Sequence, residues 1–344
     1  MRIRRAATLV CTFEGDKPVI HNFLKKEMFE CNVLALEILA ALDDWTSMED
    51  ALVRLPDPAG AATILRELIQ RDLVLTEGSP QAERDQRYRS SWRWGAVAGF
   101  YHFGLRDSDF IDAESKLAQL RKYKEEGVSP PLLTSNEGLE KVYELDSVDL
   151  DDSFFATLYK RRSVREYSTK PISSDDLAAC LYAGNGLKEI LDAGEFGRLP
   201  LTMTPSGGGR NPFELYVWAR NVTRIESGFY HYSAIDHSLG YVGDTGQRPA
   251  DLLGNQAWTN DAAAVVFLCA TFERSAWKYR QALAYRVVLM EAGAITQNLQ
   301  LAAVHRGIAA APTGALSESV IERQLGLADI EQAALLAVTL GNPA

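Results

Sequence analysis

Cysteine and histidine are scarce in this chain of 344 residues, which contains four cysteines and five histidines. Cys11, Cys31, Cys180 and Cys269 are widely separated, no two of them form a Cys-x-x-Cys pair, and no histidine stands at metal-ligand spacing. The pattern argues against a disulfide framework and against a zinc site of the usual spacing. We therefore expect no bound metal, and we predict buried free thiols in a reducing compartment.

The chain also lacks positive net charge and long apolar runs. Its formal net charge of −10 argues against a general nucleic-acid binder, which is normally basic. No uncharged apolar run reaches membrane-spanning length. The basic start at residues 1–5 superficially resembles a signal peptide, but Glu14 and Asp16 come too early and no small-residue cleavage site follows. We expect a cytoplasmic protein without nucleic-acid or membrane partners.

Residues 1–78 have the pattern of a small separate module. Apolar runs at 8–13 and 18–23 flank a polar turn and predict a hairpin; helical patterns follow at 32–42, 47–50 and 61–70, and a short strand at 73–75. This order is winged-helix-like, yet the third helix is not basic. The module resembles the peptide-recognition domain of enzymes that modify ribosomal peptides, which would bind a leader segment by adding a strand to its sheet edge. A purely structural cap is the alternative.

Residues 79–150 are predicted to form a helical connector. Ser79-Pro80 and a charged run at 83–89 mark its start, and Ser129-Pro130-Pro131 marks a second break. The aromatic stretch at 92–103 predicts a helix packed onto a larger body. His102, within this stretch, could be catalytic, but its surroundings favour a packed, hydrogen-bonded core residue.

Residues 151–344 are predicted to form the main domain. A helix is expected from Ser173 to Gly184, and a long, mostly apolar helix at 285–304 belongs in a large core or at a subunit interface. Strands are expected at 213–219, 228–232, 239–242, 262–271 and 333–340.

Two polar segments of this domain suggest ligand binding. An amphipathic helix at 154–159 ends in Arg161, Arg162, Ser163 and Arg165, whose guanidinium groups and hydroxyl suit a phosphomonoester. The alternative is a solvated basic helix end.

The second polar segment, at 205–212, contains three consecutive glycines between Ser206 and Arg210, so its backbone amides could approach a ligand closely. It enters a strand and lacks the Gly-Lys-Ser/Thr of a Walker loop; a tight, flexible turn is the alternative.

Several separated motifs resemble one family. Arg-Arg-Ser-Val-Arg-Glu-Tyr at 161–167 resembles the opening motif of the flavin-dependent nitroreductase fold. Pro-Ser-Gly-Gly-Gly-Arg-Asn-Pro-Phe-Glu-Leu-Tyr at 205–216 narrows the resemblance to the azoline dehydrogenase branch, which makes thiazoles and oxazoles in modified peptides. The segments at 98–103 and 228–232 strengthen it. Most specific is Trp277-Lys278-Tyr279-Arg280, followed by the motifs at 285–286, 291–293 and 297–299, which resemble the branch's lysine–tyrosine motif and core helix.

The resemblance covers roughly residues 90–344. It implies an α+β fold: a nitroreductase-like central mixed, largely antiparallel sheet flanked by helices, beside the winged-helix-like module. It also implies FMN as the cofactor and a homodimer. The residues implied to bind FMN are Arg161, Ser163 and Arg165 at the phosphate and ribityl chain, Arg162 beside them, Ser206 and Arg210 in a loop often contributed across the dimer, and the backbone amide of Gly314 at the reactive edge of the ring.

Two features depart from the family pattern. Many members have histidine after the glycine of the core helix, where this chain has Gly293-Ala294. The chain also ends at residues 341–344 without the basic segment that grips phosphate in simple nitroreductases.

The resemblance implies oxidation of a peptide-borne thiazoline or oxazoline, with Lys278 and Tyr279 as the catalytic pair. Aromatisation requires removal of a proton from one ring carbon and of a hydride from its neighbour, and dioxygen would reoxidise the flavin. A phenol titrates near ~10, and a neighbouring cation favours its charged form, so the pair has a physical rationale as a base. A leader-bearing peptide and a cyclodehydratase are the expected partners.

Three alternatives stay open. A desaturase of a carrier-protein-tethered substrate differs in substrate length, and an NAD(P)H-dependent nitroreductase would oxidise nicotinamide rapidly. A leader-binding scaffold of a cyclodehydratase complex would be a colourless, non-enzymatic protein.

Overall fold

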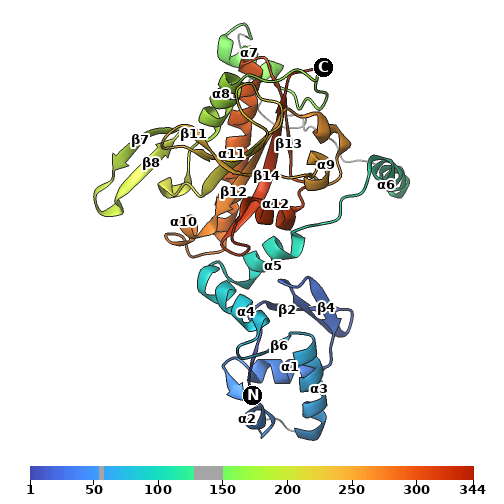
Figure 1. The fold of residues 1–344 in the computed structure, drawn as a ribbon. Coiled ribbons are helices and arrows are strands. Elements are labelled where there is room, and N and C mark those ends of the chain that lie inside the picture. Colours follow the sequence, from blue (N-terminus) through green and yellow to red (C-terminus); the bar gives the residue numbers. More distant parts are fainter. Residues whose placement is uncertain (54–57, 128–149) are drawn as a thin grey trace, which may run out of the picture.

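The computed structural model of the chain describes residues 1–53, 58–127 and 150–344. The predicted break at 129–131 lies outside the described residues. Figure 1 shows a smaller N-terminal body joined through α4 and α5 to a larger body that is built around one sheet.

The N-terminal module consists of two small antiparallel sheets and three helices. Their strand orders are β5-β1-β6 and β2-β3-β4. Its elements are β1 (Arg2–Arg5), β2 (Leu9–Glu14), β3 (Lys17–Asn22), β4 (Glu27–Glu30), α1 (Val33–Ala41), β5 (Thr46–Ser47), α2 (Met48–Val53), α3 (Pro58–Gln70) and β6 (Val74–Thr76). Ile3, Ile38 and Leu65 are fully buried between them. The predicted hairpin, helices and closing strand are confirmed, whereas β1 and β4 were not predicted.

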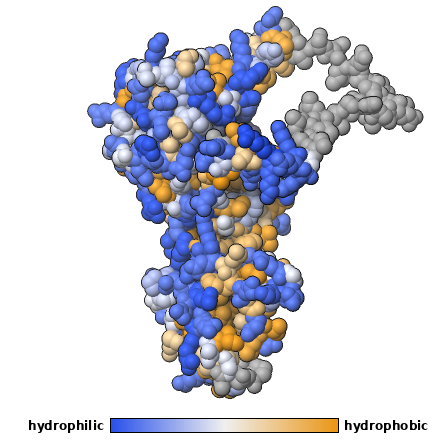
Figure 2. Space-filling view, turned by 90° about the vertical axis from the view of Figure 1, so that its right-hand side faces the viewer, coloured by the Kyte–Doolittle hydropathy of each residue, from blue (hydrophilic) through white to orange (hydrophobic). Residues whose placement is uncertain are grey.

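Large apolar side chains lie exposed on the module. Phe13, Met28 and Val33 are each about two thirds exposed, at 70%, 66% and 66%. Figure 2 shows apolar surface on the face of this module that is turned to the viewer.

Two connector helices pack against the larger body, and a third carries exposed apolar side chains. They are α4 (Pro80–Ser91), α5 (Gly95–Leu105) and α6 (Ala113–Glu126). The Trp92 ring meets the Phe272 ring at 5.3 Å, and the Trp94 ring meets the Tyr285 ring at 5.7 Å. These contacts confirm the predicted aromatic helix packed on a larger body. In contrast, Leu117, Leu120 and Tyr123 of α6 are all more than half exposed.

The larger body is a three-layer arrangement around a six-stranded sheet of order β11-β10-β9-β12-β14-β13, in which every pairing is antiparallel. Its helices α8 and α11 pack in the core on one face, and α9 and α12 pack in the core on the other. The elements are α7 (Ser153–Lys160), α8 (Ser174–Asn185), β7 (Leu187–Asp192), η1 (Gly194–Phe196), β8 (Arg198–Thr202), η2 (Gly207–Gly209), β9 (Phe213–Ala219), β10 (Gly228–Ser233), β11 (Ser238–Gly243), α9 (Pro249–Leu252), η3 (Ala257–Asp261), β12 (Ala264–Thr271), α10 (Phe272–Ala276), α11 (Leu283–His305), β13 (Ala309–Thr313), α12 (Glu318–Leu325) and β14 (Gln332–Gly341).

These elements follow the sequence signals closely. The uninterrupted apolar run of β12 is buried from residue 264 to residue 270, as expected for a central strand. Ser173 caps α8, because its hydroxyl accepts the Asp176 amide 3.0 Å away. The strands predicted at 213–219 and around 236–237 are confirmed.

The long helix α11 is buried on one side and exposed on the other. Val288, Ile295 and Leu299 lie in the core, whereas Leu283 and Met290 are 59% and 64% exposed. By length and composition α11 could span a membrane, but 44% of its most apolar window is buried inside the chain. As the central helix of a packed body, α11 is weak evidence for a membrane span.

The cysteine prediction is partly wrong. Cys180 and Cys269 are buried free thiols, but Cys11 is exposed and Cys31 is half-buried. Cys11 lies on β2, an outer strand of its small sheet, so its side chain can face solvent.

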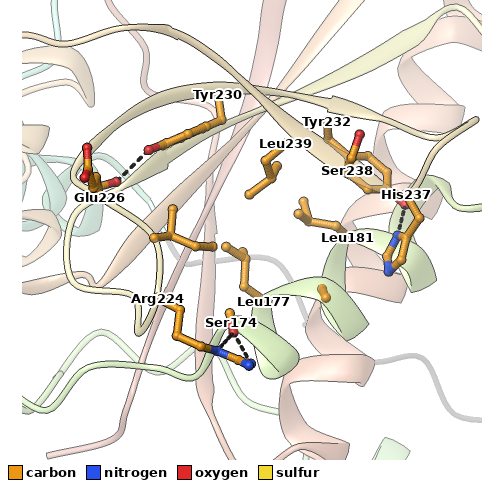
Figure 3. Close-up of a pocket in the computed structure, with 12 residues that line it drawn as sticks. Ser174, Leu177, Leu181, Arg224, Glu226, Tyr230, Tyr232, His237, Ser238 and Leu239 are labelled. Atoms are coloured by element: carbon orange, nitrogen blue, oxygen red, sulfur yellow. Dashed lines mark hydrogen bonds between the residues drawn. The ribbon is translucent and has the colours of Figure 1, made fainter.

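A cavity of about 390 Å³ lies between α8 and the β10–β11 hairpin (Figure 3). Leu177, Leu181 and Leu239 form its apolar wall, and Arg224 lies at its rim with the Ser174 hydroxyl 2.6 Å away.

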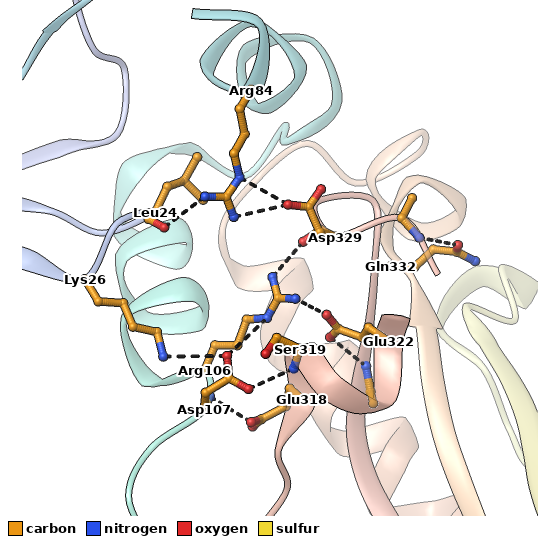
Figure 4. Close-up of polar contacts among 12 residues, drawn as sticks. Leu24, Lys26, Arg84, Arg106, Asp107, Glu318, Ser319, Glu322, Asp329 and Gln332 are labelled. Atoms are coloured by element: carbon orange, nitrogen blue, oxygen red, sulfur yellow. Dashed lines mark hydrogen bonds and ion pairs between the residues drawn. The ribbon is translucent and has the colours of Figure 1, made fainter. Parts of the chain in front are cut away.

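A polar joint connects the N-terminal module and the connector to the larger body (Figure 4). Arg84 donates to the Leu24 carbonyl at 3.2 Å and to Asp329 at 3.1 Å. Arg106, at the end of α5, pairs with the Glu322 carboxylate of α12 and donates to the Asp329 carbonyl at 3.1 Å. The module is therefore tied to the helix that follows β13.

Asp107 extends the same joint into the first turn of α12. Its amide donates to the Glu318 carboxylate at 2.7 Å, and its own carboxylate accepts the Ser319 amide at 2.8 Å. The joint thus reaches both the start and the middle of α12.

Glu322 should make stability depend on pH. Burial raises the pKa of its carboxyl from 4.5 to about 8, although Arg106 opposes the shift. The folded chain then retains a proton that the unfolded chain releases above its ordinary pKa, so this stabilisation is complete below about pH 4.5 and is lost as the pH rises through 8. We predict that the free energy of unfolding falls between about pH 4.5 and pH 8, by up to about 1.4 kcal/mol per pH unit from this group.

Urea unfolding at several pH values tests the prediction, with Glu322→Gln as a size-matched mimic of the protonated group. The variant should show a shallower fall than the parent protein. Identical slopes for both proteins would contradict the assignment to Glu322.

Candidate functional site

The glycine-rich loop connects β8 to β9 and adopts a conformation that requires glycine. Gly208 and Gly209 both have φ of +64°, in the left-handed region that disfavours side chains. The Ser206 hydroxyl accepts the Asn211 amide at 2.8 Å and closes the loop. Glycine is therefore required at these positions by the conformation of the turn.

Lys278 and Tyr279 face this loop. A Cβ atom placed on Gly208 would overlap the Tyr279 hydroxyl and lie 2.9 Å from Lys278 Nζ. Lys278 Nζ itself lies 5.3 Å from the centroid of the Tyr279 ring. The absence of a side chain at Gly208 thus leaves room for both functional groups, which come from a segment about seventy residues further along the chain.

Contacts on both sides hold the Tyr279 segment in place. The Tyr279 carbonyl accepts the indole N–H of Trp94 at 2.8 Å, so the connector fixes this turn. The guanidinium of Arg210 stacks over the exposed Trp277 ring at 4.7 Å. The predicted residues Ser206, Arg210 and the lysine–tyrosine pair are therefore brought together.

The predicted arginine segment lies along another part of the larger body. Arg161 is the C-cap of α7, and its Nη1 lies 3.5 Å from the Gln300 side chain of α11. The Val164 amide donates to the Ala310 carbonyl at 3.1 Å, which places Ser163 beside β13. Arg162 donates to the carbonyls of Tyr159 and Arg161, so it caps the helix end.

The Gly314 turn lies near the end of this segment. Arg165 stacks over Trp258 at 5.5 Å, and Gln256, two residues earlier, donates to the Thr313 hydroxyl at 2.7 Å. Gly314 follows Thr313 directly; it is exposed, and an added Cβ would meet no atom within 4 Å. Arg165 and Gly314 thus both lie close to η3.

The helix α11 contacts both groups of predicted residues, the glycine-rich loop and the arginine segment. The buried carboxylate of Glu291 accepts the Gly207 amide at 2.7 Å, whereas Gln300 meets Arg161 nine residues further on. At 1.5 Å per residue these positions are about 14 Å apart along the helix. Burial raises the pKa of Glu291, while its contacts with the Gly207 amide and Ser206 act in the opposite direction.

His102 is a core residue, as its surroundings indicated. Its Nδ1 lies 2.9 Å from the Tyr285 hydroxyl, and its ring stacks on Trp92. Burial, together with Arg106, lowers its pKa to about 3. A histidine that stays neutral and enclosed is poorly suited to proton transfer near neutral pH.

Some contacting residues were not predicted. Glu291 and Glu214 had no assigned role, although both stand in motifs that carried the resemblance. Trp94 was only part of the predicted aromatic stretch at 92–103, and Arg274 was not considered. The cavity of Figure 3 contains no predicted site residue. In the parts of the chain that the structure describes, no group of three or more His, Cys, Asp or Glu side chains could hold a metal ion.

Comparisons with known proteins give the family. The family model described as the nitroreductase family matches residues 158–342. The nitroreductase-like protein MJ1384 of Methanocaldococcus jannaschii is 30% identical over 201 residues, covering 58% of this chain and 93% of that protein.

Two further matches are a protein named for trifolitoxin processing and a chain of a microcin synthetase. The trifolitoxin-processing protein TfxB of Rhizobium leguminosarum biovar trifolii is 32% identical over 140 residues, which cover 39% of this chain and 37% of that protein. A chain of the Escherichia coli microcin synthetase McbBCD complex, solved with truncated pro-MccB17 bound, has a TM-score of 0.51 at 20% identity and covers 76% of this chain and 92% of that chain. The name of TfxB agrees with the predicted branch, and the E. coli chain agrees in fold. The family match over more than half of the sequence means that the chain belongs to the nitroreductase family.

Proposed function

We propose that the protein is an FMN-dependent azoline dehydrogenase, which oxidises peptide-borne thiazoline or oxazoline rings to thiazoles or oxazoles. The observation that carries the proposal is the close approach of Tyr279 and Lys278 to Gly208 of the glycine-rich loop. The relatives named for trifolitoxin processing and microcin synthesis support the substrate class. Membership of the nitroreductase family supports flavin chemistry.

The polar groups on the chain suit a flavin mononucleotide. Arg161, Ser163 and Arg165 would hold the phosphate and ribityl chain, because guanidinium groups match phosphate geometry. The exposed backbone of Gly314 would meet the ring edge, and Ser206 and Arg210 would line the pocket. Bound FMN would supply the electron-accepting ring, and dioxygen would restore it.

The separation of these groups favours a site completed by a second copy of the chain. Arg161 and the glycine-rich loop contact positions on α11 that are about 14 Å apart. The exposed side of α11 carries Leu283, Val287 and Met290, which a second copy could cover. In such a homodimer, the loop of one chain would complete the pocket formed by the arginines of the other.

The proton step is assigned to Tyr279. As a phenolate, Tyr279 would accept the proton from the azoline carbon. Lys278 Nζ lies over the Tyr279 ring, 5.3 Å from its centroid, and both side chains face Gly208. The indole N–H of Trp94 anchors the backbone of this turn, which would keep the phenol directed at the pocket.

The N-terminal module would recruit the substrate. A cavity of about 380 Å³ lies between β4, α1 and α3, and Phe29, Ile64 and Leu68 are among its lining residues. β4 is one of the two outer strands of the sheet β2-β3-β4 in the described module, so a peptide could add a further strand there. Every second side chain of the bound leader strand would enter the cavity. The enzyme that forms the azoline, a cyclodehydratase, is the proposed partner, because the matched E. coli chain belongs to a synthetase complex.

Replacing Tyr279 by phenylalanine should abolish azole formation while FMN is retained, because only the phenolic oxygen is lost. The measurement is a mass spectrum of a co-expressed azoline peptide, which should show no loss of two hydrogens per ring. Tyr241→Phe, at an exposed tyrosine on β11, is the control and should leave turnover unchanged. Normal turnover by Tyr279→Phe would refute the assignment.

Replacing Arg161 or Arg165 by methionine should weaken FMN binding by about tenfold or more, since a charged hydrogen bond contributes roughly 1.5–3 kcal/mol. The flavin absorbance of the purified protein, divided by its protein concentration, measures this loss. Arg248→Met, at a mostly exposed arginine near α9, serves as the matched control. Full flavin occupancy in both arginine variants would argue against this phosphate site.

Replacing Ile64 by glutamate should weaken leader binding, because the charge would enter the apolar part of the cavity beside Phe29 and Leu68. Fluorescence anisotropy of a labelled synthetic leader, copied from the N-terminal segment of a candidate precursor peptide, measures the affinity. Val53→Glu changes an 81% exposed residue of the same module and should have no effect. Equal affinity for all three proteins would favour the structural-cap alternative.

A further inference from the structure

Asn211, near the end of the glycine-rich loop, adopts a backbone conformation that is uncommon for any residue other than glycine. Asn211 has a φ of +44°, in the left-handed region that few non-glycine residues adopt. Its Nδ2 donates to the Pro200 carbonyl at 2.7 Å, its Oδ1 accepts the Thr202 hydroxyl at 3.0 Å, and its amide donates to Ser206 at 2.8 Å. Such strain persists only where several contacts enforce it.

Arg274 of α10 adds a further contact and extends it to the other side of the site. Its Nη1 donates to the Asn211 carbonyl at 3.0 Å, and its Nη2 pairs with the Glu214 carboxylate. Its own carbonyl accepts the Arg210 guanidinium at 2.7 Å. One residue therefore contacts the loop through both its side chain and its backbone.

Glu214 fixes the orientation of Arg274. It stands near the start of β9, and its second oxygen lies 2.9 Å from His231 Nε2 on the neighbouring strand β10. The Glu214 side chain is 22% exposed, so its ion pair with Arg274 is partly shielded from water. Both side chains line a cavity of about 430 Å³, into which Arg274 could turn if the carboxylate were removed.

The same α10 leads directly into the proposed catalytic pair. The amides of Lys278 and Tyr279 donate to the Ser275 carbonyl at 3.2 Å and 2.9 Å. Ser275 is the residue after Arg274, so the backbone that is fixed by Arg210 also carries the turn with the phenol. Gly208 approaches Tyr279 from the loop side of this arrangement.

We propose that Glu214 and Arg274, the Glu214–Arg274 clamp, are positioning residues that set the separation between the glycine-rich loop and Tyr279. They act through the Asn211 carbonyl, which accepts from the Arg274 side chain, and through the Arg274 carbonyl, which accepts from the Arg210 side chain. They do not touch the reacting atoms. The inference rests on the proposed function for its kinetic consequence only. Its structural consequence, a loop held against α10, can be measured separately.

Two variants test the kinetic consequence in the purified holoprotein. Glu214→Gln keeps the size and shape of the side chain but removes its charge. Arg274→Lys keeps the charge, but its single nitrogen cannot replace the two guanidinium nitrogens that contact Asn211 and Glu214. In both, kcat for azoline oxidation should fall about tenfold to a hundredfold, as expected for a displacement of about 1 Å, with KM and flavin content unchanged. A purely structural role would lower the melting temperature or yield and leave kcat per folded molecule intact.

Limited trypsin digestion tests the structural consequence without any azoline. Cleavage after Arg210 should accelerate several-fold in both variants. Asp175→Asn, which removes an exposed pairing with Arg224, should leave both cleavage and kcat unchanged. If the parent protein oxidises no azoline, the proposed function fails, while the trypsin result still decides for or against the clamp. Parent-like cleavage and parent-like kcat in both variants would overturn it.

Discussion

The packing of α11 into the larger body is the interaction on which the rest of the site depends. Its buried side contacts α8 and the strands β13 and β14, so its position is fixed by apolar burial over most of its length. Glu291 and Gln300 project from this fixed helix toward the glycine-rich loop and Arg161. Because the helix cannot shift without disrupting the core, the spacing between these two regions is fixed as well.

Polar groups near this core are kept there by specific partners. Glu291 loses most of its hydration, yet the Gly207 amide provides a hydrogen bond, so the carboxylate constrains the loop. The Glu322 carboxyl group is likewise held by Arg106 and by the Ala334 amide at the joint. In both cases a buried carboxyl group specifies where a neighbouring segment lies, because an unpartnered polar group would be unfavourable there.

Local structure could be predicted from the sequence where the signal is local. The Ser173 cap, the buried run of β12 and the strand after Pro212 were all found from short patterns. The strands β1 and β4 were missed because they are short, and most of β1 is charged. The approach of Tyr279 to Gly208 joins segments seventy residues apart, and only the family resemblance pointed to it. No spacing rule could have found Arg274 beside Asn211, because that contact arises when α10 and the loop meet in the folded body.

The polar joint at Arg84 and Arg106 has a consequence for any peptide that is held at β4 and processed near Tyr279. With the module tied to α12 and to Asp329, the distance from the binding edge to the reaction site would be constant. The enzyme would then select rings by their distance along the peptide from the anchored segment. Rings nearer to the anchored segment than this reach would escape oxidation, and the substrate would need a spacer of minimum length before its first azole.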